Sequence, residues 1–226
     1  MTEAELEEVV ADCPTLFHMA ERGSWGSIGE RGLLSTSALL DLYGVSGAER
    51  EAIESMRRSA SIPLNATGLP RAVVRDQLPM DDKGLLRCLP GHMAPRDWYE
   101  LLNSKVFFWL TRDRLHTLTS ASTYLDTSHD VIEVDTRSLI EAHRERIWFC
   151  PMNSGSTKPY PHPRDESTFL RIADYPYDHW RRKKRKRGER VVELAVDHSV
   201  PDVRRYVTRV IVMRGTKVEE IVFSAT

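Results

Sequence analysis

Short apolar segments of the strand type alternate irregularly with short amphipathic helices, and this pattern constrains the fold more than any other feature. The segments expected as strands, rich in β-branched and aromatic residues, are 16–18, 105–110, 131–134, 147–150, 191–196, 208–213 and 218–223. The segments expected as helices are 2–12, 24–31, 36–60 (in two pieces broken at 44–47), 96–102, 112–120 and 138–143. Because regular βαβ units are missing, the pattern argues against a doubly wound parallel sheet and predicts an α+β fold.

Two long segments separate these elements. Residues 61–96 contain five prolines and three glycines, which predicts irregular structure, and residues 151–179 form a polar loop rich in Pro, Ser, Asp and His. A length of 226 residues suits one domain, so we expect a single domain over 1–226. The sequence has no GxGxxG after a strand, no GxxxxGK[ST] and no GxSxG, which excludes the common nucleotide-binding loops and the serine-hydrolase elbow.

Composition also bounds the compartment and the chemistry. No stretch of about 18 uncharged apolar residues is present, and the acidic N-terminus is unlike a secretory signal, so we expect no membrane span. The three cysteines are widely spaced, without a CxxC pair, which is typical of free thiols in a reducing cytoplasm. The eight histidines form no HExxH or similar pattern, so no metal site is expected.

Charge is distributed very unevenly along the chain. The formal net charge is -1, from 32 Lys and Arg against 33 Asp and Glu. Residues 181–190 (RRKKRKRGER) hold eight of the bases and one of the acids, a local charge of +7. The other 216 residues therefore carry a net charge of -8. An acidic body with one basic segment predicts that any polyanionic partner contacts that segment.

Residues 16–20 read LFHMA, and an expected helix and a Gly-Leu-Leu turn at 32–34 follow them. A strand ending in His, then a helix and a Gly-Leu turn, resembles the opening of ADP-ribosyltransferase folds, and most closely that of DarT-type nucleic-acid ADP-ribosyltransferases. In those families the His binds the ribose of NAD, and the neighbouring backbone holds the nicotinamide amide. The resemblance implies a NAD site at His18, Met19, Ala20 and Gly32; the alternative for His18 is a structural histidine.

Two later segments resemble strands of the same families. Residues 106–109 (VFFW) resemble the strand whose aromatic side chains line the nicotinamide pocket, which implies this role for Phe108 and Trp109; the alternative is core packing. Residues 191–201 (VVELAVDHSVP) resemble the catalytic strand, with Glu193 at the position of the catalytic glutamate. Two-fold alternation places Glu193 on an apolar face, where a carboxylate is costly without a partner. The alternative is a glutamate on an edge strand that reaches solvent.

Two arginine positions complete the resemblance. Residues 53–58 (IESMRR) resemble a DarT helix that ends in an Arg assisting catalysis, which implies Arg58, with Arg57 as the alternative. Arg75 is a second candidate, for holding the diphosphate of NAD. Residues 61–104 are longer than the corresponding DarT segment.

As a whole, the resemblance implies an ADP-ribosyltransferase-like core, a split mixed β-sheet flanked by helices. The implied activity is transfer of ADP-ribose from NAD to an acceptor, with release of nicotinamide and without a metal. The transition state of this reaction resembles an oxocarbenium ion, which a carboxylate near the ribose stabilises. Glu193 has the side chain for this role.

The resemblance also gives the basic segment a place, because in this fold the loop before the catalytic strand recognises the acceptor. The residues implied to bind nucleic acid are Trp180, Arg181, Arg182, Lys183, Lys184, Arg185, Lys186 and Arg187. Cations neutralise phosphates, and Tyr175, Tyr177 and Trp180 are candidates for stacking on bases. We therefore expect a DNA or RNA acceptor, as in toxin or phage-defence enzymes, which work with an antitoxin or hydrolase partner. The alternative is a solvated loop or a nuclear import signal.

Other functions remain open on the sequence alone. They are a non-catalytic nucleic-acid-binding module, an RNA 2′-phosphotransferase-like enzyme and a protein-directed transferase. Within the polar loop, residues 153–157 (NSGST) form either a plain turn or a backbone cradle for a ligand oxygen. Arg164, in the same loop, has no role that the sequence suggests.

Overall fold

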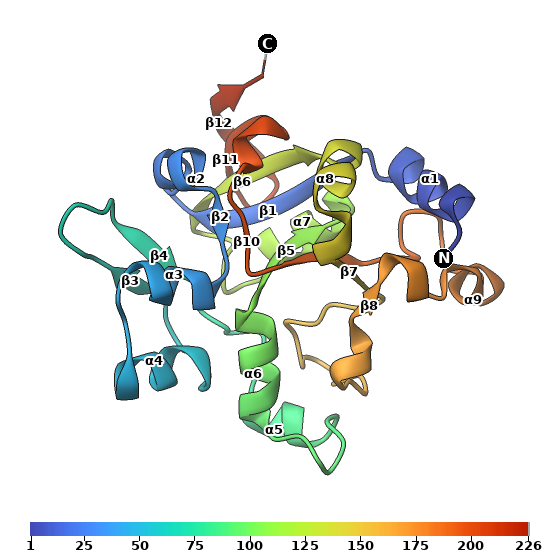
Figure 1. The fold of residues 1–226 in the computed structure, drawn as a ribbon, viewed down its shortest axis with the longest axis horizontal. Coiled ribbons are helices and arrows are strands. Elements are labelled where there is room, and N and C mark those ends of the chain that lie inside the picture. The colour runs from blue at the N-terminus through green and yellow to red at the C-terminus, as the bar shows by residue number, and fades with distance from the viewer. Residues whose placement is uncertain (226) are drawn as a thin grey trace.

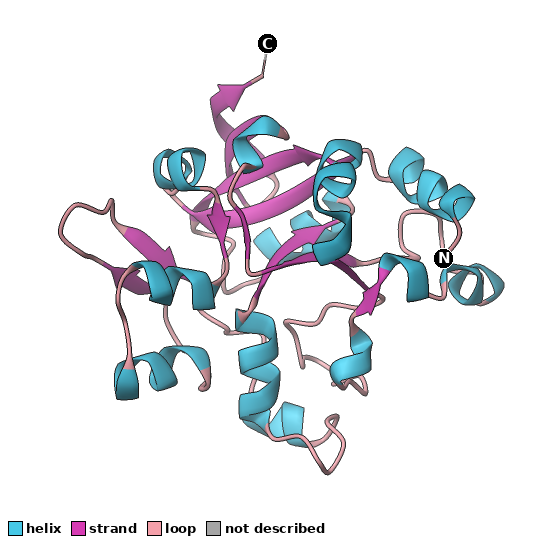
Figure 2. Ribbon diagram, viewed as in Figure 1, coloured by secondary structure: helices cyan, strands magenta, loops and turns pink. Residues whose placement is uncertain are grey.

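A large antiparallel sheet forms the centre of the protein in a computed structural model that describes residues 1–225 (Figures 1 and 2). The strands are β1 (Thr15–Glu21), β2 (Leu33–Leu34), β3 (Ile62–Leu64), β4 (Ala72–Val74), β5 (Lys105–Trp109), β6 (Ser128–Asp135), β7 (Ile147–Cys150), β8 (Leu170–Arg171), β9 (Glu193–Asp197), β10 (Ser199–Val200), β11 (Val207–Arg214) and β12 (Lys217–Ser224). The helices are α1 (Glu3–Asp12), α2 (Trp25–Arg31), α3 (Thr36–Leu42), α4 (Gly47–Glu54), α5 (Asp82–Leu86), α6 (Pro95–Asn103), α7 (Arg112–Thr119), α8 (Thr136–His143) and α9 (Tyr177–Arg182).

The main sheet has the strand order β12-β11-β6-β1-β5-β9-β7-β8. The helices lie around it, which confirms the α+β class (Figure 2). Every pair of strands in the described residues is antiparallel, whereas the resemblance implies a mixed sheet. Residues 1–225 contain none of the βαβ crossovers that place parallel strands side by side, which accounts for the difference.

The sheet is split between β1 and β5. These two strands share one pair of partners, Phe17 and Trp109, whereas β1 pairs with β6 along its whole length and β5 pairs with β9 likewise. Beyond Phe17 the two central strands diverge. The sheet is therefore two four-stranded halves held together by a single register pair, and the opening between them is available for a ligand.

Each face of the sheet has its own hydrophobic core. Leu16, Phe108 and Leu194 belong to the cluster on one face, together with residues of α1 and α8. On the other face, Trp98 of α6 packs with Ala195, and Phe17 packs in a separate cluster with residues of α7 and β11. Both faces of the central strands are thus buried, which explains why these strands read as continuous apolar runs in the sequence.

The segment 61–96 has more regular structure than its composition predicts. Residues 62–64 and 72–74 pair as the β3–β4 hairpin, and residues 82–86 form α5, so the prediction of an irregular segment was wrong there. The hairpin packs on α3 and α4 through a small apolar cluster that includes Leu40 and Ile53 (Figure 1). Tertiary packing of this kind is not visible in a local Pro and Gly count.

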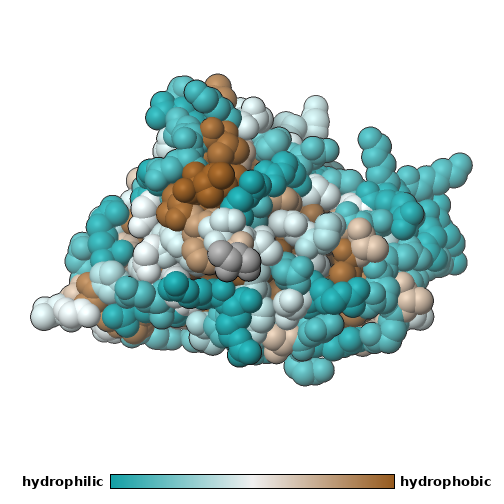
Figure 3. All heavy atoms as spheres, turned by 90° about the horizontal axis from the view of Figure 1, so that it is seen from above, coloured by the Kyte–Doolittle hydropathy of each residue, from teal (hydrophilic) through white to brown (hydrophobic). Residues whose placement is uncertain are grey.

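The chain ends in the β11–β12 hairpin, whose outer strand projects from the body beside the C-terminus (Figure 1). Viewed from that side, the surface carries a patch of apolar atoms (Figure 3). The exposed large apolar side chains of β12 are Val218, Ile221 and Val222. No helix in the described residues is long and apolar enough to cross a membrane.

Candidate active site

A cavity of about 340 Å³ lies at the opening between β1 and β5. Its walls come from both halves of the sheet, from α2 and α3, and from the segment that follows β4. Volumes of roughly 300–1,000 Å³ are typical of small-molecule sites. The predicted site residues that line it are His18, Met19, Ala20, Gly32, Arg58, Arg75, Phe108, Trp109 and Glu193. The structure thus brings together in one cavity every residue implied to bind NAD or to act in catalysis.

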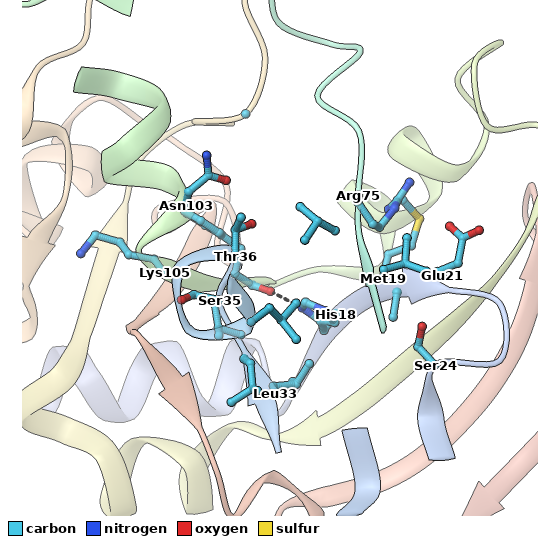
Figure 4. A pocket seen from close by; sticks show the side chains of 18 of the residues that line it. His18, Met19, Glu21, Ser24, Leu33, Ser35, Thr36, Arg75, Asn103 and Lys105 are labelled. Atoms are coloured by element: carbon cyan, nitrogen blue, oxygen red, sulfur yellow. Dashed lines mark hydrogen bonds between the residues drawn. The ribbon is translucent and has the colours of Figure 1, made fainter. Parts of the chain in front are cut away.

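His18 bridges the split with its side chain. Its Nδ1 lies 2.8 Å from the carbonyl oxygen of Phe107 (Figure 4), and because a carbonyl only accepts, Nδ1 carries the proton. The imidazole satisfies a backbone carbonyl that the diverging strands leave without a ladder partner. Burial lowers the pKa of His18 to about 4, so the ring is neutral and its Nε2 is an acceptor. In Figure 4 His18 lies between Arg75 on one side and Asn103 and Lys105 on the other.

Glu193 is the first residue of β9, an interior strand that pairs with both β5 and β7. Its side chain is 4% exposed, so the alternative of an edge-strand glutamate reaching solvent was wrong. Both carboxylate oxygens accept the backbone N–H of Ser154, at 3.2 Å each. Burial raises the pKa of Glu193 to about 7, against the opposing effect of the Ser154 hydrogen bond and of Arg164. A buried carboxyl with a pKa near neutrality is typical of a catalytic site.

Phe108 and Trp109 both line the cavity and also pack against the hydrophobic core. Phe108 is 1% exposed and belongs to the core, yet it lines the cavity, and its ring centroid lies 5.7 Å from that of His18. Trp109 is half-buried on the opposite face of β5. Gly32 has a φ of 87°, and a Cβ there would lie 2.4 Å from Cα of Pro201, so only glycine allows the β2–β10 pairing at this edge of the cavity.

Arg58 is buried and lines the cavity, whereas Arg57 does not. The Arg58 guanidinium donates to the carbonyl oxygens of Arg75 at 2.8 Å and Ile53 at 2.5 Å, and to Oδ1 of Asn103 at 3.0 Å. Burial lowers the pKa of Arg58 to about 10, so it stays charged at neutral pH. All three acceptors are uncharged oxygens, so none of these hydrogen bonds neutralises the positive charge of Arg58.

Arg75 presents an unsatisfied donor beside the same cavity. Its Nε is buried without a hydrogen-bond partner among the described residues, and its guanidinium stacks 5.0 Å from the ring centroid of Tyr124. His129 packs its ring edge against Tyr124. Both of its ring nitrogens are buried and have no hydrogen-bond partner among the described residues. Buried donors without partners usually indicate a ligand or water in the functional state.

The sequence did not identify several residues that shape this site. Asn103 holds Arg58 and the end of α4, Ser154 holds Glu193, and Tyr124 covers Arg75. Each acts across at least 39 positions of sequence, so no local motif signals it. The polar loop 153–157 was the one usable signal: the sequence leaves it as a plain turn or a cradle for a ligand oxygen, and in the structure its Ser154 N–H donates to the Glu193 carboxylate.

A second cavity, of about 490 Å³, lies on the other side of the 153–157 loop. Asn153 lines both cavities, and Val192, which precedes Glu193, lines the second one. Arg114, Lys158 and Arg185 also line it, together with Glu189, which pairs with Arg114, so its lining has an excess of positive charge.

The basic segment is less available than its sequence suggests. Arg181 pairs with Glu8 at 2.7 Å, Arg187 with Asp12 at 3.0 Å and Arg182 with Asp178 at 3.2 Å. The acidic helix α1 therefore neutralises part of the segment, beside which it lies in Figure 1. Within the segment 181–190, the exposed cations for which the described residues provide no acidic partner are Lys183, Lys184 and Lys186.

The aromatic residues around the basic segment also differ from expectation. Tyr175 and Tyr177 are 1% and 2% exposed, so the prediction that they stack on bases was wrong; they pack in the core. Trp180 is half-buried, and the guanidinium of Arg185 covers its ring at 4.0 Å. Apolar burial outweighs the surface role because both tyrosines lie on the inner side of α9 and of the turn before it.

The chain belongs to the DUF7002 family, a family of unknown function whose model matches residues 14–207. The match runs from the residue before β1 to the first residue of β11, so it includes every residue of the first cavity. No curated protein matches the chain.

Proposed function

We propose that this protein is an NAD-dependent ADP-ribosyltransferase that modifies nucleic acid, with the first cavity as the NAD site. The observation that carries the proposal is the convergence of His18, Arg75 and Glu193, from three distant segments, on one cavity at the split of the sheet. The resemblance at each segment is short by itself. A shared cavity is the arrangement that the chemistry requires.

The residues of the cavity suit the groups of NAD. The diphosphate is anionic, and Arg58 supplies positive charge with only uncharged hydrogen-bond partners. Arg75 adds an unsatisfied Nε, although its Nη2 lies 3.8 Å from a carboxylate oxygen of Asp76. The Nε2 lone pair of His18 is an acceptor for a ribose hydroxyl. Phe108 and Trp109 provide apolar surface for the nicotinamide ring.

Glu193 has the central role in the proposed mechanism. Bound NAD supplies the electrophilic ribose carbon and nicotinamide as leaving group: the carbon–nitrogen bond breaks, its electron pair stays on nicotinamide, and an acceptor nitrogen or oxygen bonds to the carbon and loses a proton. The Glu193 carboxylate stabilises the positive charge that develops on the ribose, in a dry site where such an interaction is strong. Since its pKa is about 7, activity rises with pH through neutrality as the carboxylate forms.

The acceptor would approach from the second cavity, because Asn153 lines both cavities and Val192, the neighbour of Glu193 in the chain, lines the second. Its cations and the unpaired lysines of the basic segment favour a phosphate-bearing acceptor, and a base within a duplex would first have to leave the stack. We propose single-stranded DNA or RNA as this acceptor. The proposal places the protein in the cytoplasm and gives it a toxin-like role, with an antitoxin or hydrolase as partner.

The experiment incubates the protein with labelled NAD and, in parallel, single-stranded DNA, RNA, 2′-phosphorylated RNA and a protein mixture. We expect nicotinamide release and label on an oligonucleotide. Turnover only with 2′-phosphorylated RNA would indicate a 2′-phosphotransferase, and label only on protein would indicate a protein acceptor. Oligonucleotide binding without NAD consumption would indicate a non-catalytic binding module.

Two glutamate variants assign the reaction to the cavity. Glu193→Gln should lower turnover by about 10²–10³-fold. The matched control is Glu133→Gln, which changes a glutamate that is equally buried but lies on β6 and pairs with Arg112 and Arg209. Its turnover should stay near that of the unmodified protein. Full activity of Glu193→Gln would contradict the assignment.

A further inference from the structure

The 153–157 loop is the element through which the protein holds Glu193. The backbone N–H of Ser154 is the donor that both carboxylate oxygens share. The orientation of the carboxylate therefore depends on where the loop places residue 154. The groups that hold this residue come from outside the loop.

Arg164 is the main support of the loop. It is 3% exposed, and its guanidinium donates from Nη1 to the Ser154 carbonyl at 2.9 Å and from Nη2 to the Ser156 carbonyl at 2.8 Å. Its Nε donates to the His162 carbonyl at 3.1 Å. All three acceptors are backbone carbonyls in the segment 154–162, and no carboxylate within salt-bridge distance competes for the guanidinium among the described residues. The rigid fork of arginine fixes two peptides at once, which a lysine cannot do.

Trp98 of α6 supports the same residue from the other side. Its Nε1–H donates to the Ser154 carbonyl at 3.3 Å, and the guanidinium of Arg164 stacks 5.5 Å from its ring centroid. Trp98 is fully buried, so its ring is held in place by the core packing around it. The Ser154 carbonyl thus accepts from two buried side chains while the N–H of the same residue holds Glu193.

The far end of the loop is fixed as well. The N–H of Thr157 donates to the Pro79 carbonyl at 3.1 Å, and its Oγ1 accepts the N–H of Asp81 at 3.1 Å. Gly84 of α5 packs so closely that a Cβ there would lie 2.6 Å from Thr157 Oγ1. The segment that contains α5 and α6 therefore has a structural purpose: it supports the loop behind Glu193.

We propose that Arg164 is a positioning residue, which orients the Glu193 carboxylate by holding Ser154 in place. Arg164 does not itself line the cavity and makes no hydrogen bond or ion pair with the Glu193 carboxylate among the described residues, so it acts through the loop and its lining residue Ser154. Support at one remove from the reacting group commonly changes activity by 10–100-fold when it is lost. The catalytic consequence rests on the proposed function, whereas the effect on Glu193 itself does not.

The titration of Glu193 gives a readout that needs no turnover. The charged or titratable groups near its carboxyl are Arg164 of the polar loop, Arg114 of α7 and the Cys150 thiol of β7. Loss of the Ser154 hydrogen bond and loss of the Arg164 charge both favour the protonated form of Glu193. A charge effect and a positioning effect are separated by comparing two substitutions at the same residue.

The test compares Arg164→Gln with Arg164→Lys, and the control is Arg146→Gln. Arg146 also donates to backbone carbonyls, those of Ser199 at 2.9 Å and Asp197 at 3.4 Å, but at the other end of β9. The Glu193 carboxyl is followed by carbon-13 NMR over pH 4–9. We expect both Arg164 variants to raise the titration midpoint by about one pH unit, roughly tenfold in proton affinity, and the control to leave it unchanged.

Each other outcome decides the question. If only Arg164→Gln raises the midpoint of the Glu193 titration, Arg164 acts through its charge and the positioning role is refuted. If neither variant changes the midpoint, Arg164 has no role at Glu193. If neither variant folds, Trp98→Phe removes one donor to the Ser154 carbonyl and keeps the ring, and it should raise the midpoint by a smaller amount; no change would overturn the proposal.

Kinetics then separate this inference from the proposed function. In the presence of turnover, Arg164→Lys should lower kcat by 10–100-fold with little change in KM, and it should move the pH profile in the same direction as the Glu193 titration. Raised midpoints without any NAD turnover in the unmodified protein would refute the proposed function and leave the positioning role intact.

Discussion

The cavity and the basic segment hold two very different sets of cations. In the cavity, Arg58 is buried and donates only to uncharged oxygens. Arg75 is half-buried, with Nε unpartnered among the described residues and Nη2 3.8 Å from Asp76. In the segment the cations are many and exposed, yet Arg181, Arg182 and Arg187 already pair with acids of α1 and α9. In the cavity the guanidinium of Arg58 has no hydrogen-bonded acid to neutralise it, whereas among the exposed cations of the segment only the lysines are free of such a partner in the described residues.

This difference teaches that the number of cations in a sequence does not measure their capacity to bind an anion. A charge already paired in the folded protein must leave its partner before it binds another, and solvent weakens what remains. A buried charge held by carbonyl oxygens keeps its field, because the surrounding medium screens it poorly. Three of the four predictions that follow test whether the two sets of cations differ in this way, and the one at Glu193 tests the buried carboxylate of the cavity.

The largest effect on stability is expected for Arg58→Met. The substitution leaves buried acceptors at Arg75, Ile53 and Asn103 without their donor, so the free energy of unfolding should fall by about 3 kcal/mol. Urea denaturation measures it. An unchanged midpoint would mean that Arg58 is as dispensable as a surface cation.

Glu193→Gln should have the next largest effect, and it should stabilise the protein at high pH. The raised pKa of about 7 means that the folded state holds a proton between pH 4.5 and 7 that the unfolded state has lost. The contribution of Glu193 to stability is therefore full below pH 4.5 and is lost as the pH rises through 7. The variant should be more stable by about 2 kcal/mol at pH 8 and no different below pH 4.5. Greater stability of the unmodified protein at pH 8 would contradict this assignment.

A smaller effect is expected for nucleic-acid binding. Replacing Lys183, Lys184 and Lys186 with glutamine should weaken single-stranded oligonucleotide binding at least tenfold and reduce the slope of log K against log salt by about 2. Fluorescence anisotropy over a salt series measures both. The matched triple Arg181→Gln, Arg182→Gln, Arg187→Gln should have the weaker effect, and equal effects would mean that the pairing with α1 and α9 is irrelevant.

The smallest effect is expected for Arg187→Gln alone. This exposed arginine pairs with Asp12 at 3.0 Å in a solvent-exposed position, where ion pairs contribute little to stability. The urea midpoint should not change measurably, at either low or high salt. A clear loss of stability would show that α1 is held by this pair and not by its apolar side.

Much of the site could be predicted because its residues lie in short strands with a local signature. His18, Phe108 and Glu193 each belong to a segment whose alternation or motif is readable without the fold, and all three line the cavity. The expected helices and strands mostly match the structure for the same reason. The expected strand 105–110, for example, corresponds to β5 (Lys105–Trp109).

The rest depends on contacts between distant segments, which no window of sequence contains. The burial of Tyr175 and Tyr177, the β3–β4 hairpin and the pairing of the basic segment with α1 all arise from tertiary packing. The role of Arg164 is of the same kind, because three backbone carbonyls and the Trp98 ring define it. Backbone acceptors have no identity in the sequence, so an arginine that binds them has no motif.

The most direct test of the central claim is NAD binding to the Glu193→Gln protein by titration calorimetry, since this variant should bind without consuming the ligand. NAD should bind at one site, and adding His18→Ala or Arg75→Gln should weaken that binding at least tenfold, because each removes a group facing the cavity. The control Glu193→Gln with Arg187→Gln should bind as well as Glu193→Gln alone. No binding at millimolar NAD, or binding that neither cavity substitution weakens, would contradict the account.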